Sequence, residues 1–160
     1  MDEWHDKRIL ILGCGNGLCG DGGFGPAVAR RCRDECAIPS DVSVLNTGTS
    51  VRNILFDVLL AAERPAKIII LDAIDGGREP GEIFELDLDA YPTHKIDDFS
   101  MHQVPTSNLL RELRDLGGVE VSVLACQVAY IPEEVRPGLS EAVEVSVGRA
   151  AEMLSREYLA

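Results

Sequence analysis

The sequence predicts a three-layer α/β sandwich, in which helices cover both faces of a mostly parallel, five-stranded twisted sheet with one antiparallel edge strand. Apolar runs typical of buried strands alternate along the chain with amphipathic stretches typical of helices. One further segment, residues 82–88, alternates apolar and polar side chains, as an edge strand with one solvated face does. The 160 residues contain no linker of distinct composition, so we expect a single domain over residues 1–160.

Each element has its own signal in the sequence. Four apolar runs predict the remaining strands, at residues 9–12, 42–46, 67–71 and 119–129. Apolar residues at three- and four-residue spacing predict helices over residues 26–36, 51–62 and 104–116 and after residue 140. Pro26 fits the first turn of its helix, Ser50 and Ser140 fit N-caps, and Gly117 with Gly118 fits a helix end.

The composition disfavours several classes of function. The net charge of −12 argues against a partner that is a nucleic acid or an anionic membrane, because both are polyanions. The polar N-terminus is followed by an apolar run that is too short for the hydrophobic core of a signal peptide or for a membrane span. Five cysteines, an odd number, do not suggest a disulfide framework. We therefore expect a cytoplasmic protein.

The most informative segment is residues 13–25, in which seven of thirteen residues are glycine. We call it the glycine-rich segment. Glycine reaches positive φ angles and leaves room for close approach of a ligand or of another backbone. One carboxylate, Asp21, lies within the segment. Two interpretations follow: either the phosphates of a ligand lie on this loop, or the loop shapes a site around Asn16 and Asp21.

The first interpretation has weak support. Residues 15–20 match the dinucleotide-binding pattern Gly-x-Gly-x-x-Gly. That pattern also needs an acidic residue at the tip of the second strand to hold the ribose, and this chain has Asn46 and Thr47 there. The sequence has no Gly-Lys-Ser/Thr phosphate loop. A nucleotide-binding α/β protein therefore stays as a less favoured alternative.

The second interpretation brings two carboxylates and an imidazole to one edge of the sheet. Asp21 lies in the glycine-rich segment, Asp72 follows the third strand, and His102 lies in a loop before a helix. Oxygen and nitrogen ligands of this kind suit a divalent cation. Taken singly, each residue could also serve in a turn, as a cap or at the surface. Cys14 or Cys19 as a nucleophile with His102 as its base is a further, less favoured interpretation.

Several short motifs occur in an order that resembles one known family. They are residues 9–16 with Asp21 and Phe24-Gly25, residues 46–49, Leu71-Asp72-Ala73, Ser100-Met101-His102-Gln103, and Gln127 with Pro132-Glu133 and residues 137–140. Over nearly the whole chain, they are similar to the [NiFe]-hydrogenase maturation endopeptidases. The most similar subgroup serves the coenzyme F420-reducing hydrogenases of methanogenic archaea. The resemblance implies the phosphorylase/hydrolase-like form of the predicted fold.

The resemblance also implies an enzyme that cuts a peptide bond. Members of the family remove a C-terminal extension from the hydrogenase large-subunit precursor after nickel insertion, and the nickel in the substrate is the recognition element. By resemblance, Asp72 and His102 would hold this nickel or another divalent cation; we expect Asp21 as the third ligand, and the two aspartates are the candidate catalytic residues. The residues expected to shape the loop and the substrate site are Gly15, Asn16, Gly22, Gly48, Thr49 and Gln103. No nucleotide cofactor is expected, and the protein is expected to be a monomer.

The chain departs from the family pattern at one position. The family has two adjacent acidic residues in this loop, the second being the ligand, whereas here Asp21 is followed by Gly22. We hypothesise that the loop shifts so that Asp21 reaches the metal; otherwise the alternative is a non-catalytic nickel-binding maturation chaperone. The sequence has no His-Glu-x-x-His helix. We therefore favour docking of the substrate's nickel over metallopeptidase chemistry, with the general base not identified.

Overall fold

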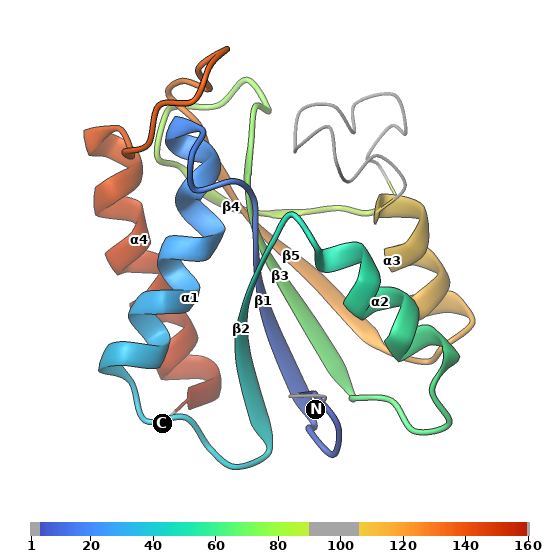
Figure 1. Ribbon diagram of the computed structural model, residues 1–160. Coiled ribbons are helices and arrows are strands. Elements are labelled where there is room, and N and C mark those ends of the chain that lie inside the picture. Colours follow the sequence, from blue (N-terminus) through green and yellow to red (C-terminus); the bar gives the residue numbers. More distant parts are fainter. Residues whose placement is uncertain (1–3, 90–105, 160) are drawn as a thin grey trace.

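The computed structural model describes residues 4–89 and 106–159 and shows the predicted five-stranded sheet (Figure 1). The strands are β1 (Ile9–Cys14), β2 (Val42–Gly48), β3 (Lys67–Ile74), β4 (Ile83–Leu86) and β5 (Glu120–Gln127). Their order in the sheet is β2-β1-β3-β5-β4. β4 is antiparallel to β5, whereas the other neighbouring pairs are parallel, which confirms the predicted fold class.

Helices cover both faces of this sheet. They are α1 (Phe24–Glu35), α2 (Val51–Leu60), α3 (Thr106–Asp115) and α4 (Glu141–Leu154), with a 3-10 turn η1 (Gly20–Gly23) before α1 and a π-helical turn η4 (Ser155–Leu159) after α4. Figure 1 shows α1 and α4 on one face and α2 and α3 on the other. Within the described residues, no helix is long and apolar enough to cross a membrane.

The two faces of the sheet contribute to two separate hydrophobic cores. Along β1, Ile9 and Ile11 pack into the core beneath α1 and α4, whereas Leu10 and Leu12 pack into the core beneath α2 and α3. Successive side chains of a strand point to opposite faces, so a strand that is covered on both sides is apolar throughout. The continuous apolar runs in the sequence are explained by this arrangement.

The structure differs from the predictions at a few element ends. β3 continues to Ile74, because its pairing with β5 extends to Ile74 opposite Gln127, so Asp72 lies inside the strand rather than after it. The predicted cap at Ser50 makes no side-chain hydrogen bond. Ser140 does cap α4, since its hydroxyl oxygen accepts a hydrogen bond from the amide of Val143.

One glycine sets how closely α1 approaches the sheet. A Cβ atom on Gly25 would overlap with the carbonyl oxygens of Cys14 and Leu71. We expect Gly25→Ala to lower the free energy of unfolding by about 3 kcal/mol, because backbone must move to make room for the methyl group. Urea unfolding followed by circular dichroism measures this. Gly17→Ala is the control, since nothing lies within 4 Å of a Cβ there; equal stability of the two variants would contradict the prediction.

Candidate functional site

The carboxyl ends of the three neighbouring parallel strands β2, β1 and β3 meet at one edge of the sheet. The amide of Gly15, just after β1, donates a hydrogen bond to the carbonyl of Gly48 at the end of β2, with an N···O distance of 2.9 Å. On the other side, a Cβ atom on Gly15 would lie 3.5 Å from Oδ1 of Asp72 in β3. The structure therefore brings Gly15, Gly48 and Asp72 together, as the parallel topology predicts.

Asp72 is the buried carboxyl group of this edge. Its exposed fraction is 2%, and its Oδ1 accepts a hydrogen bond of 2.8 Å from the amide of Ala73. Burial raises the pKa of the Asp72 carboxyl well above its usual value, because the charged form loses its hydration. Such a group is stabilised in its ionised form by a cation that arrives at the site.

Cys14, beside Asp72, is not set up as a nucleophile. Its Sγ lies 3.5 Å from the hydroxyl of Thr47, which itself donates a hydrogen bond to the carbonyl of Gly13. Burial, and then the negative charge of Asp72, raise the pKa of the Cys14 thiol well above its usual value. Since the thiolate is the reactive form, this environment argues against nucleophilic catalysis by Cys14.

Asp21 is fully buried in η1, and hydrogen bonds within the chain use both of its carboxylate oxygens. Oδ2 accepts from the amides of Ala129 and Tyr130, at 2.7 and 3.1 Å, and from the hydroxyl of Ser140 at 2.9 Å. Oδ1 accepts from the amide of Ser140 at 2.7 Å. The carboxylate thus joins the glycine-rich segment to the loop after β5 and to the N-cap of α4.

This geometry changes the interpretation of Asp21. Four donors from the chain bind this carboxylate, three of them at Oδ2 and one at Oδ1, so both oxygens are held in place. If Asp21 turned toward a metal, as hypothesised from the sequence, these hydrogen bonds would break and buried N–H groups would be left unpaired. The structure gives Asp21 an architectural role. Among the described residues there is no group of three or more His, Cys, Asp or Glu side chains placed to hold a metal ion.

Gly22 follows Asp21 in η1 and has space for a side chain. Its nearest contacts, measured from a Cβ built at this position, are the carbonyl oxygen of Asn16 at 3.2 Å, Cβ of Cys19 at 3.6 Å and Cδ1 of Ile131 at 3.8 Å. A shift of a few tenths of an ångström would accommodate a substituent. A Cβ atom thus fits at the family's second acidic position after a small shift, and the position carries no carboxylate in this chain.

A pocket of about 270 Å³ lies next to Gly15. Residues that line it include Gly15, Asn16, Arg30, Asn46, Gly48 and Thr49. Four of these, Gly15, Asn16, Gly48 and Thr49, are predicted site-shaping residues. Arg30 belongs to none of the sequence motifs and was not predicted as a site residue. The signal that could have found it is the four-residue spacing from Pro26, which places both residues on the face of α1 that borders the pocket.

Two predicted site residues, His102 and Gln103, lie outside the described residues. Their proposed positions at this edge therefore stay predictions.

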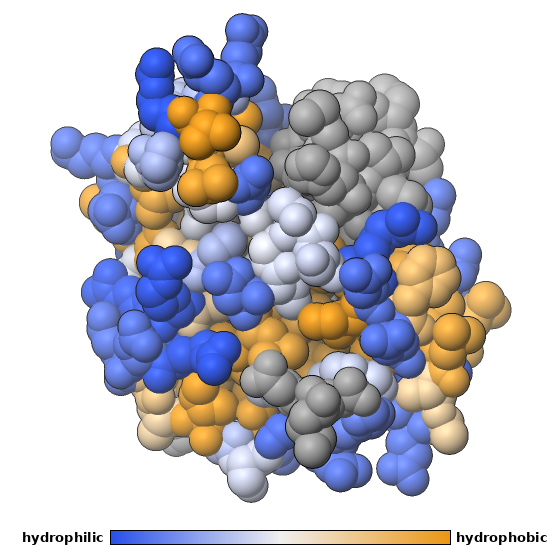
Figure 2. Space-filling model, viewed as in Figure 1, coloured by the Kyte–Doolittle hydropathy of each residue, from blue (hydrophilic) through white to orange (hydrophobic). Residues whose placement is uncertain are grey.

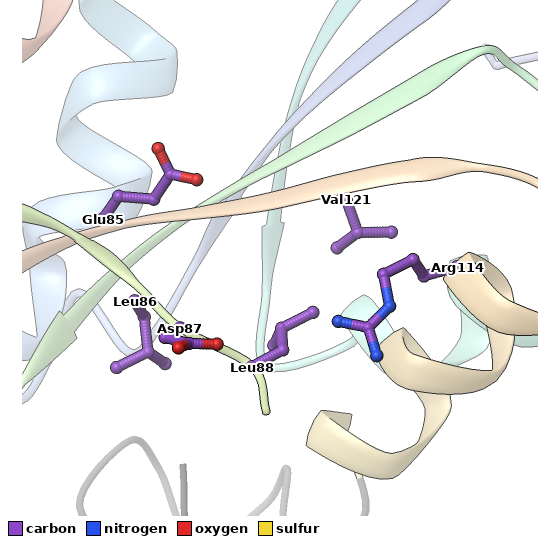
Figure 3. A pocket seen from close by; sticks show the side chains of 6 residues that line it. All are labelled: Glu85, Leu86, Asp87, Leu88, Arg114 and Val121. Atoms are coloured by element: carbon purple, nitrogen blue, oxygen red, sulfur yellow. The ribbon is translucent and has the colours of Figure 1, made fainter. Parts of the chain in front are cut away.

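Another pocket, of about 320 Å³, lies between β4 and α3, where Figure 3 shows Arg114 from α3 near Leu88 and Val121. The guanidinium of Arg114 forms ion pairs of 2.7 Å with Asp89 and 2.8 Å with Asp115. Its charge is thus already paired. We do not assign this pocket to the functional site.

Comparison with known proteins identifies relatives along most of the chain. A family profile described as hydrogenase maturation protease matches residues 26–157. A Methanocaldococcus jannaschii protein provisionally named a hydrogenase maturation protease is 40% identical over 152 residues, which cover 94% of this chain and 96% of the relative. The coenzyme F420 hydrogenase subunit delta of Methanothermobacter thermautotrophicus is 31% identical, with 96% of each chain covered.

A solved structure shows the same fold. The crystal structure of a [NiFe] hydrogenase maturation protease from Thermococcus kodakarensis matches with a TM-score of 0.77 at 26% sequence identity. The match covers 94% of this chain and 91% of that one.

Proposed function

Because this chain belongs to the hydrogenase maturation protease family, we propose that it removes a C-terminal extension from the large-subunit precursor of a [NiFe]-hydrogenase after nickel insertion. The observation that carries the proposal is the buried carboxyl group of Asp72, beside the bare backbone of Gly15 at the sheet edge. The similarity to a coenzyme F420 hydrogenase subunit supports an F420-reducing hydrogenase as the source of the precursor. We further propose that the protein acts as a monomer in the cytoplasm.

The nickel that the precursor carries is the recognition element in this proposal. Asp72 suits the binding of this nickel, because a nearby cation stabilises the ionised form of a buried carboxyl group that has lost its hydration. His102 is proposed as a second ligand. Asp21 does not fit, because its oxygens are committed to Ala129, Tyr130 and Ser140. We therefore propose a nickel-docking site with fewer carboxylates than the family pattern has.

The residues of this chain then act chiefly by positioning. Asp72 holds the nickel-bearing part of the substrate at the sheet edge, so that the scissile bond lies next to it. The four hydrogen bonds that Asp21 accepts hold its carboxylate in place. We therefore propose the other carboxyl group near the glycine-rich segment, that of Asp72, for proton transfer. The glycines beside it leave room for the backbone of a protein substrate.

The direct test uses purified precursor with and without nickel. We expect this protein to shorten only the nickel-loaded precursor, as seen by intact mass spectrometry. Cleavage of the nickel-free precursor at the same rate would contradict nickel recognition. No cleavage of either form would contradict the endopeptidase activity.

A second function, a nickel-binding maturation chaperone, is favoured by the geometry of Asp21 and Gly22. The loop presents no free carboxylate where the family has one. This alternative predicts nickel-dependent binding of the precursor without any loss of mass. The nucleotide-binding alternative is not retained, because the profile and the relatives belong to a protease family.

Restoring the missing carboxylate tests these two functions against each other. We expect Gly22→Asp to lower the KM for nickel-loaded precursor about tenfold, because a further anionic ligand is added beside the docking site. Gly23→Asp is the control, since it adds the same charge in the same turn and its Cβ also has space, with nearest contacts of 3.3 and 3.5 Å. If only Gly22→Asp cleaves and the wild type does not, the natural protein is a degenerate peptidase.

A further inference from the structure

We propose that the pocket lined by Asn16, Arg30, Asn46 and Thr49 binds a carboxylate of the precursor's C-terminal extension. We call it the donor pocket. The inference rests on the proposed function, because it names a feature of the same substrate. It assigns to Arg30 the role of a specificity-determining residue.

The donor pocket has a charge opposite to that of the protein. The chain carries a net charge of −12, yet among the described residues no acidic side chain lines this pocket, and Arg30 contributes a positive charge to it. An acidic surface repels anions at long range, so a carboxylate that is to bind needs a local cation and local donors. The donor pocket provides both.

The two asparagines that line the pocket both use their side-chain oxygen locally. Oδ1 of Asn16 accepts a hydrogen bond of 2.9 Å from the amide of Leu18, and Oδ1 of Asn46 accepts one of 3.1 Å from the amide of Gly48. Each side-chain carbonyl is thus used within its own turn. The NH₂ group of each asparagine remains as a donor, and the hydroxyl of Thr49 adds another. This set suits the oxygens of a carboxylate.

Arg30 adds a guanidinium group that is available to a ligand. It is exposed on α1, and no carboxylate of the described residues forms an ion pair with it, whereas the next residue, Arg31, pairs with Glu35 at 3.3 Å. A guanidinium group binds a carboxylate through two parallel hydrogen bonds, which gives both energy and orientation.

The donor pocket lies close enough to Asp72 to contact the same substrate chain. Gly15 lines the pocket, and a Cβ built on Gly15 would lie 3.5 Å from Oδ1 of Asp72. An extended peptide advances about 3.3 Å per residue. A substrate whose nickel is held at Asp72 can therefore place a residue of its extension beside Arg30.

The carboxylate can come from an acidic side chain of the extension or from its C-terminus. The first experiment measures kcat and KM for nickel-loaded precursor with Arg30→Glu. We expect KM to rise about tenfold or more with kcat changed less than twofold, because binding is lost while the reacting groups are unchanged. Arg33→Glu is the matched control, since Arg33 is exposed on the same helix and does not line the pocket. Equal effects of the two variants would overturn the inference.

Two variants of the precursor then identify the source of the carboxylate. In one, the acidic residues of the extension become amides; in the other, four added glycines move the terminal carboxylate. Either change should remove the difference in KM between wild type and Arg30→Glu if that carboxylate is the ligand. If neither does, the inference is wrong.

A binding measurement separates this inference from the proposed function. If the wild type does not cleave the precursor, the endopeptidase function fails, and fluorescence anisotropy with the labelled extension peptide still tests the donor pocket. About tenfold weaker binding to Arg30→Glu than to Arg33→Glu supports the inference, and equal binding overturns it.

Discussion

Replacing Asp21 with asparagine is expected to lower the free energy of unfolding by about 3 kcal/mol. The carboxylate accepts four hydrogen bonds in a fully buried position, three from backbone amides and one from the hydroxyl of Ser140. An asparagine replaces one acceptor oxygen with an NH₂ group, which would face donors on whichever side it lies. Each buried donor left without an acceptor costs about 1–3 kcal/mol. Urea unfolding followed by circular dichroism measures the change.

The matched control for this substitution is Asp41→Asn. Asp41 is also an aspartate with a charged hydrogen bond, 2.8 Å from Arg8, but both side chains are about half exposed. A surface ion pair of this kind contributes little to stability, so the control should unfold close to the wild type. An Asp21→Asn variant that is as stable as the wild type but does not cleave would contradict the architectural role and restore the catalytic one.

The role of Asp21 could not have been predicted from the sequence. Its partners Ala129, Tyr130 and Ser140 lie 108, 109 and 119 residues away along the chain, so no local pattern connects them. The fold was predictable, because period-two and helical patterns of apolar residues are local and the sheet topology follows from their order. The sheet edge that contains Gly15, Gly48 and Asp72 was predictable for the same reason.

The glycine-rich segment serves several purposes, which its composition alone does not separate. Gly13 and Gly25 have no room for a Cβ where α1 approaches β1, and Gly15 and Gly20 have positive φ angles of 126° and 54°. These four glycines are explained by backbone geometry. Gly17 has neither restriction, and Gly22 and Gly23 need only small shifts to hold a Cβ, so backbone geometry alone does not require glycine at these three positions.

The surface around this edge is mostly hydrophilic, with apolar side chains exposed at a few places (Figure 2). Leu18 of the glycine-rich segment and Val135 of the loop after β5 are 53% and 69% exposed. The backbones of these two loops are hydrogen-bonded, since the amide of Arg136 donates to the carbonyl of Leu18 at 2.8 Å. Asp21 thus fixes a pair of loops whose outer surface is available to a protein substrate.

Replacing Asp72 with asparagine is expected to lower kcat/KM for nickel-loaded precursor by about a hundredfold or more. The change keeps the size of the side chain and the Oδ1 that accepts a hydrogen bond from the amide of Ala73, but it removes the ionisable carboxyl group that we propose for nickel docking. Loss even of an indirect partner of a metal site commonly costs ten- to a hundredfold, and a direct ligand should cost at least as much. Cleavage at the wild-type rate would show that Asp72 does not take part.

The same substitution should change how stability depends on pH. Burial raises the pKa of Asp72 in the folded state above its unfolded value. The wild type therefore has its full stability below the unfolded pKa and loses stability as pH rises through the folded pKa. Asparagine does not titrate, so the variant should gain in stability relative to the wild type as pH rises from about 4 to 8.

Asp41→Asn provides a control at a carboxyl group that titrates below this pH range. The hydrogen bond from Arg8 lowers the pKa of Asp41 in the folded state, so its contribution to stability is present above the unfolded pKa and is lost as pH falls. Urea unfolding across this pH range should therefore give a stability difference that changes with pH for Asp72→Asn and one that stays nearly constant for Asp41→Asn. A difference for Asp72→Asn that does not change with pH would contradict the burial of an ionisable carboxyl group at this site. A variant that is more stable at neutral pH but does not cleave would show that Asp72 is kept for docking the substrate at a cost in stability.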